Sequence, residues 1–125
     1  MSKRILVVED QEDNRRILRD LLTSAGYEMI EAVTGEEGLA MARIHRPDLI
    51  LMDIQLPELD GYESSRRLKA DPTLQTIPIV AVTSYAMSGD DAKAYGAGCV
   101  GYVTKPFSPR QLLAKLREFL TVNDP

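Results

Sequence analysis

Five short apolar runs, each followed by a stretch with helical spacing, constrain the fold of this chain more than any other feature. The runs occupy residues 5–8, 29–32, 49–52, 79–82 and 101–104. Strands that are apolar throughout, rather than at every second residue, are covered on both faces. The alternation predicts an α/β, doubly wound (βα)5 fold, with a five-stranded parallel sheet and helices on both faces.

The stretches between these runs carry ordinary helix signals. The first has an apolar stripe and ends near Gly26. Helices are expected over 35–45, 61–70 and, more faintly, 90–95. Ser108 is placed to cap the last helix, with Pro109 at its first position. The stripe of the first helix is Ile17, Leu18, Leu21, Leu22 and Ala25.

Length and composition narrow the class of protein. A chain of 125 residues with 44% hydrophobic residues fits one domain, expected over 1–125. A net charge of −4 argues against nucleic-acid binding. The sequence contains no run of about 18 apolar residues, so no membrane span is expected. One cysteine and one histidine exclude a disulfide framework and a Cys-rich or multi-His metal centre. We expect a cytoplasmic protein, and the Met1 start and complete last helix favour a stand-alone chain.

Polar residues follow four of the five apolar runs. Glu9 and Asp10 come after the first, Asp53 after the third, Thr83 after the fourth and Lys105 after the fifth. In a doubly wound sheet, ligands bind beyond the carboxyl ends of the strands. We therefore expect these side chains to meet at one edge of the sheet.

Three carboxylates in one crevice repel one another, and a divalent cation would offset that repulsion. Mg²⁺ prefers carboxylates, waters and phosphate oxygens. Lys105 adds a positive charge and Thr83 a hydroxyl, so the set suits transfer of a phosphoryl group. Asp53 lies centrally and is the best candidate for a nucleophile that forms an aspartyl phosphate.

Each of these residues also has an ordinary structural explanation. Glu9 and Asp10 could cap the next helix, and Asp53 could start a turn. Thr83 could be a hydrogen-bonded strand-end hydroxyl, and Lys105 a solvated lysine. Their joint placement at the strand ends favours a functional site over four separate structural roles.

The segments 5–10, 47–53, 56–61, 78–83 and 101–106 together resemble the bacterial response-regulator receiver domain over essentially the whole chain. This is the CheY-like family, whose fold is flavodoxin-like. Residues 52–58 and Gly98-Cys99 also resemble a single-domain regulator of cell division within that family. The resemblance implies a two-component response regulator that takes part in phosphorelay signal transduction.

The resemblance implies a role for each matching residue. Asp53 would accept a phosphoryl group from a histidine of a sensor kinase or phosphotransfer protein. Asp10 and Asp53 would bind Mg²⁺ directly, together with the backbone carbonyl of Gln55, and Glu9 would act through a water. Lys105 would pair with the phosphoryl oxygens, and the Lys105–Pro106 peptide would be cis.

The family also implies a conformational switch. Thr83 would move to the phosphoryl group and Tyr102 would rotate inward, so that helix 4, strand 5 and helix 5 present a changed surface to a downstream protein. Such a protein phosphorylates and dephosphorylates only itself and is not a turnover enzyme.

Several positions need separate comment. Glu9-Asp10 replaces the more usual Asp-Asp pair, and Ser84 replaces a small apolar residue. Gln55 and Tyr85 flank the expected phosphoryl site and are predicted to tune dephosphorylation. Other residues have plainer expectations: a buried hydrophobe for Cys99, a helix-end or solvent role for His45, and solvated helix faces for Arg15, Arg16, Arg66 and Arg67.

Three alternatives share parts of this pattern. A flavodoxin-like cofactor carrier needs an anion cradle after the first strand, where this chain has the acids of residues 9–13. A phosphatase similar to the haloacid dehalogenase group needs an acid at position 55, which is Gln. A phosphorylation-independent interaction module stays open, although intact Asp53, Thr83 and Lys105 argue against it.

Overall fold

The computed structural model describes residues 3–56, 59–83 and 90–122. Its strands form one all-parallel sheet in the order β2-β1-β3-β4-β5, which confirms the predicted doubly wound (βα)5 fold. The strands are β1 (Arg4–Val8), β2 (Glu28–Ala32), β3 (Leu49–Asp53), β4 (Ile79–Thr83) and β5 (Gly101–Thr104). The helices are α1 (Glu12–Ser24), α2 (Gly35–His45), α3 (Gly61–Ala70), α4 (Asp90–Gly96) and α5 (Pro109–Val122).

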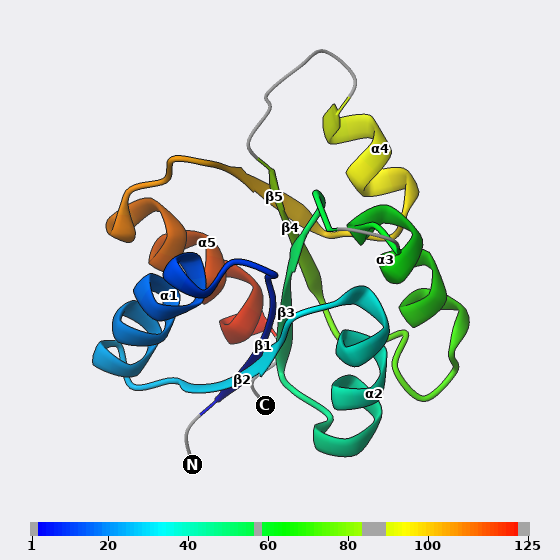
Figure 1. The fold of residues 1–125 in the computed structure, drawn as a ribbon, viewed down its shortest axis with the longest axis horizontal. Coiled ribbons are helices and arrows are strands. Elements are labelled where there is room, and N and C mark those ends of the chain that lie inside the picture. The colour runs from blue at the N-terminus through cyan, green and yellow to red at the C-terminus, as the bar shows by residue number, and fades with distance from the viewer. Residues whose placement is uncertain (1–2, 57–58, 84–89, 123–125) are drawn as a thin grey trace.

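Helices cover both faces of the sheet, with α1 and α5 on one side and α2, α3 and α4 on the other (Figure 1). Successive strand residues point to opposite faces, so each strand feeds two cores. In β1, Ile5 and Val7 pack toward α1 and α5, whereas Leu6 and Val8 pack toward α2 and α3. All four are at most 1% exposed. This double burial explains why the central strands β1, β3 and β4 are apolar at nearly every position.

The strand order places the site. From β1 the chain first adds β2 on one side and then returns to add β3 on the other. The carboxyl ends of β1 and β3 therefore lie next to each other at the point where the winding reverses. Val8 pairs with Met52 in this register, so the residues that follow them emerge side by side.

Side-chain caps fix where three helices begin. The Thr34 hydroxyl accepts the backbone N–H of Glu37 at 3.0 Å, and the Asp60 carboxylate accepts that of Glu63 at 2.8 Å. The predicted cap of the last helix is confirmed, because the Ser108 hydroxyl accepts the N–H of Gln111 at 3.0 Å. Each cap satisfies a backbone donor that the helix itself leaves unpaired.

Two expectations for α1 are wrong. Ile17 is 58% exposed, because Leu18 and Leu22 form the buried face of this helix and Ile17 lies beside it. Arg15 is not solvated: only 14% of its side chain is exposed, and it is paired with Glu31 of β2. Helical spacing marks an apolar side of a helix but does not fix which flanking residue the neighbouring elements cover.

Cys99 is buried as predicted, at 4% exposure, and its thiol lies 3.6 Å from the Ser65 hydroxyl. Burial raises the pKa of the Cys99 thiol. Among the described residues, no helix is both long enough and apolar enough to cross a membrane.

Candidate functional site

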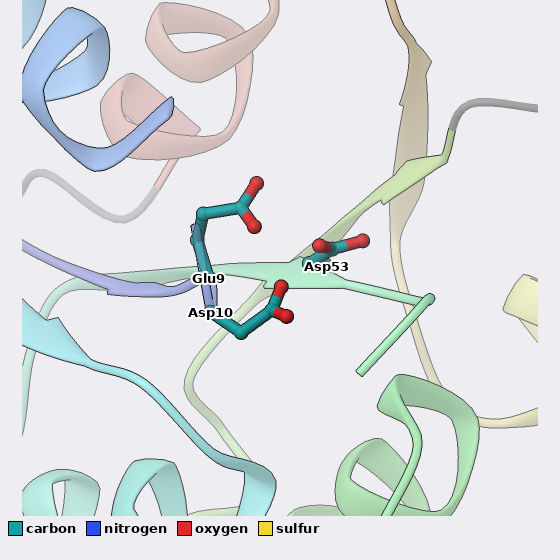
Figure 2. A group of neighbouring side chains, drawn as sticks. All are labelled: Glu9, Asp10 and Asp53. Atoms are coloured by element: carbon teal, nitrogen blue, oxygen red, sulfur yellow. The ribbon is translucent and has the colours of Figure 1, made fainter. Parts of the chain in front are cut away.

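Three carboxylates gather where β1 and β3 end. Glu9 follows the last residue of β1, Asp10 comes next, and Asp53 is the last residue of β3. Each carboxylate brings an oxygen within 4.8 Å of the others, and Figure 2 shows the three side chains at these neighbouring strand ends. Glu9 and Asp53 are 2% and 5% exposed, whereas Asp10 is open to solvent. The predicted meeting of these acids is confirmed.

The electrostatics of this group favour a cation. Partial desolvation raises the pKa of Asp10, and the adjacent Glu9 carboxylate raises it further. Closely spaced carboxylate oxygens at the edge of an open cavity are the donors that Mg²⁺ takes, and it completes its shell with waters. The residues present therefore fit a magnesium ion. A cavity of about 240 Å³ is lined by Glu9, Asp10, Gln11, Asn14, Asp53, Gln55 and Lys105.

Asp53 is held by the loop that follows it. Its Oδ1 accepts the backbone N–H of Gln55 at 3.0 Å. The loop then returns to α3, where the Gly61 N–H donates to the Ile54 carbonyl at 3.1 Å. A side chain at Gly61 would collide with the Asp53 carbonyl and lie 2.7 Å from the Ile54 Cα. A residue without a Cβ is needed there to let α3 approach the end of β3.

Lys105 reaches the acids from the other side of the crevice. Its Nζ lies 2.6 Å from Glu9 Oε1 and 3.6 Å from Asp53 Oδ2. Its backbone N–H donates to the Thr83 carbonyl at 2.6 Å, which ties the end of β5 to the end of β4. The Lys105–Pro106 peptide is cis, as expected from the resemblance.

Thr83 and Tyr102 occupy the positions proposed for the switch. Thr83 is the last residue of β4 and is 5% exposed. Tyr102, in β5, is half-buried, and its ring meets that of Tyr95 of α4 edge-on at 6.3 Å between centroids. Ser84 and Tyr85 lie outside the described residues.

Sequence reasoning missed the part that Arg15 plays beside the site. Its Nη1 donates to the Glu9 carbonyl at 2.9 Å, and its Nε lies 3.4 Å from Glu31 Oε1. Arg19 holds the same carboxylate through two bonds, at 2.8 and 2.6 Å. An acid in a strand that a helix partly covers is stabilised by a cation from that helix. Glu31 was that signal in the sequence.

Residues 5–117 match the response regulator receiver domain. The chain belongs to this family. The receiver domain is also similar to the polar-differentiation response regulator DivK of Brucella anthropi, at 46% identity over 96% of this chain and 98% of that protein. DivK of Brucella ovis is 45% identical over the same shares. The expected likeness to a single-domain regulator within the family is thereby confirmed, and the chain is a DivK-like receiver domain of two-component signalling.

Solved structures agree with this assignment. A response regulator from Chloroflexus aurantiacus superposes with a TM-score of 0.93 at 30% identity and covers 97% of this receiver domain and 99% of that chain. The receiver domain of a sensor histidine kinase from Pseudomonas aeruginosa has a TM-score of 0.90 at 34% identity, with the same coverage. That structure has a magnesium ion coordinated in its active-site cleft.

Proposed function

We propose that this receiver domain accepts a phosphoryl group on Asp53 with the help of Mg²⁺, taken from a phosphohistidine of a sensor kinase or phosphotransfer protein in the cytoplasm. The observation that carries the proposal is the placement of Asp53 among two further carboxylates and an ammonium group at one strand edge. The residues would hold a magnesium ion through Asp10, Asp53 and the Gln55 carbonyl, with Glu9 acting through a water.

The geometry supports distinct tasks for the residues. The Gln55 N–H orients the Asp53 carboxylate through Oδ1. Oδ2 faces Lys105, whose ammonium group can balance the charge of the incoming phosphoryl oxygens. A bound magnesium ion would supply further neutralisation of that charge. Positioning and charge balance are the main contributions that a protein makes to phosphoryl transfer.

The donor has room to approach. A groove of about 490 Å³ runs beside the acidic cavity, between α1 and the loop after β5. It is lined by Glu9, Asn14, Ile17, Leu18, Lys105, Pro106 and Phe107. The exposed Ile17 gives this groove an apolar wall that a protein donor could cover.

The phosphoryl group would then act as a ligand that selects one conformation. It adds close to two negative charges at Asp53. We propose that Thr83 and Tyr102 move toward it and that the surface of α4, β5 and α5 changes for a downstream protein. The chain would phosphorylate and dephosphorylate itself without turning over a separate substrate.

Incubation with acetyl phosphate tests the proposal, with the intact mass of the protein as the readout. We expect one phosphoryl group to be added with Mg²⁺, none without it, and none in Asp53→Ala. Asp20→Ala, which removes an acid on the exposed side of α1, should behave as the unaltered protein. Mg²⁺-independent addition, or addition to Asp53→Ala, would contradict the proposal.

A downstream protein that binds Asp53→Ala as tightly as the phosphorylated chain would favour the phosphorylation-independent module.

A further inference from the structure

The ammonium group of Lys105 is shared unequally between two carboxylates. Its 2.6 Å separation from Glu9 Oε1 is that of a short charge-assisted hydrogen bond. Its 3.6 Å separation from Asp53 Oδ2 is too long for a hydrogen bond and leaves a weaker ion pair. In this structure Lys105 is therefore bonded to Glu9 rather than to the proposed phosphoacceptor.

The Glu9 side chain is built into this position. Its other carboxylate oxygen accepts the Gln11 N–H at 3.2 Å. Its own N–H donates to the Ala32 carbonyl at 3.0 Å, and its carbonyl accepts from Arg15 at 2.9 Å. Only 3% of the Glu9 side chain is exposed, against 19% for Lys105. Among the described residues, Lys105 is the cation that pairs with this carboxylate, and separating the two would leave a buried charge without its partner.

The length of the Glu9 side chain decides this pairing. An aspartate is shorter by one carbon–carbon bond of about 1.5 Å, so a carboxylate at the same backbone position would fall roughly that far short of Lys105. The separation would then exceed hydrogen-bond distance. An aspartate would still keep a negative charge beside Asp10, and with it the charge that a metal ion needs.

We propose that Glu9 is a positioning residue that holds Lys105 away from Asp53 in the resting receiver, so that the length of this side chain limits the rate at which Asp53 accepts a phosphoryl group. The inference rests on the proposed function. For Lys105 to donate a short hydrogen bond to phosphoryl oxygens at Asp53, its Nζ has to move toward Asp53, and this movement lengthens its bond to Glu9 Oε1. Each transfer then includes the weakening of one short, largely buried hydrogen bond, which an aspartate at position 9 would not impose.

The test compares Glu9→Asp with the unaltered protein at saturating Mg²⁺ and acetyl phosphate. We expect Asp53 to be phosphorylated about three- to tenfold faster in Glu9→Asp, which lies in the lower part of the range for the coupling of two contacting side chains. Glu12→Asp, the same shortening at an exposed acid of α1, is the matched control and should leave the rate unchanged. Thermal unfolding checks that all three proteins are folded.

Two further readouts do not depend on phosphorylation. NMR of the Lys105 ammonium group should show faster proton exchange with water in both Glu9→Asp and Glu9→Gln. Calorimetric titration with Mg²⁺ should give nearly the same affinity for Glu9→Asp and a weaker one for Glu9→Gln, which lacks the charge.

The outcomes separate the two proposals. An unchanged or slower phosphorylation of Glu9→Asp, with Asp53→Ala still inert, would overturn the role of Glu9 and leave the proposed function standing. Ammonium exchange that is the same in all variants would also overturn it. If none of the proteins is phosphorylated, the proposed function itself fails and the rate-limiting role of Glu9 fails with it.

Discussion

At the scale of single residues, the site contains more negative charge than positive charge. Three carboxylates face one ammonium group, and the pKa of Asp10 is raised first by partial desolvation and then by the adjacent Glu9 carboxylate. The sequence was sufficient to predict which residues gather here, because strand ends in a parallel sheet share an edge. It could not predict that Lys105 pairs with Glu9, since that contact joins residues 96 positions apart and depends on one methylene of reach.

Arg15 supports the site through the Glu9 carbonyl, and its loss should be costly. We expect Arg15→Met to lower the free energy of unfolding by about 1–3 kcal/mol, because a buried carbonyl and a carboxylate both lose a charged donor. Urea denaturation measures the change. Arg16→Met, at a side chain that is 67% exposed, should stay within about 0.5 kcal/mol. Equal effects of the two substitutions would show that Arg15 has no special role.

Glu31, which pairs with Arg15, should make the stability of the protein depend on pH. Hydrogen bonding to Arg19 holds the pKa of Glu31 below its ordinary value of 4.5. Because the native pKa is the lower one, this contribution to stability is complete above the unfolded pKa and is lost as the pH falls through the native value. As the pH falls from about 5.5 to 3, the free energy of unfolding of Glu31→Gln should therefore decrease less steeply than that of the unaltered protein. Urea denaturation at each pH measures it. A parallel decline would contradict this.

At the scale of elements, local signals carried most of the prediction. Continuous apolar runs marked the strands, and Ser108, Pro109 and Gly26 marked helix ends that the structure confirms. The errors lie on α1, where Ile17 is exposed and Arg15 is covered. Both outcomes depend on tertiary neighbours, because Arg15 pairs with Glu31 of β2 and Ile17 lines the open groove between α1 and the loop after β5.

The approach of α3 to the end of β3 depends on Gly61. We expect Gly61→Ala to lower the free energy of unfolding by about 1–3 kcal/mol, because the added methyl group meets the Asp53 and Ile54 backbone. Since this backbone also carries the Asp53 side chain, phosphorylation should slow as well. Gly96→Ala is the matched control, because nothing lies within 4 Å of its added Cβ. Unchanged stability and rate in Gly61→Ala would contradict the close approach.

At the scale of the whole molecule, the winding reversal between β1 and β3 assembles the site and concentrates its repulsion there. Repulsion between these carboxylates lowers the stability of the fold, and a bound cation would offset it. The overall topology could be predicted because strand residues feed a core on each face of the sheet. Strands of this kind are apolar on both sides, and that pattern is visible in the sequence. The sequence predicted an excess of negative charge at the carboxyl edge of the sheet, but it did not predict how the carboxylates and Lys105 pair there.

Magnesium should therefore stabilise the entire domain. At a concentration of one hundred times Kd, we expect about 2.7 kcal/mol of added stability, seen as a rise in Tm that chelation reverses. Asp10→Asn should be more stable than the unaltered protein without Mg²⁺, because the pKa of Asp10 is raised by its surroundings. The same variant should respond weakly to Mg²⁺. A full response in Asp10→Asn would exclude Asp10 as a ligand.

In the proposed function, Asp53 is the one of the three carboxylates that carries the phosphoryl group. Reduction with borohydride after incubation with acetyl phosphate and Mg²⁺ converts an aspartyl phosphate into homoserine, which peptide mass spectrometry can place in the chain. We expect homoserine at position 53 alone, and none when Mg²⁺ is omitted. Reduction at position 9 or 10, or a phosphorylated chain with position 53 unchanged, would contradict it.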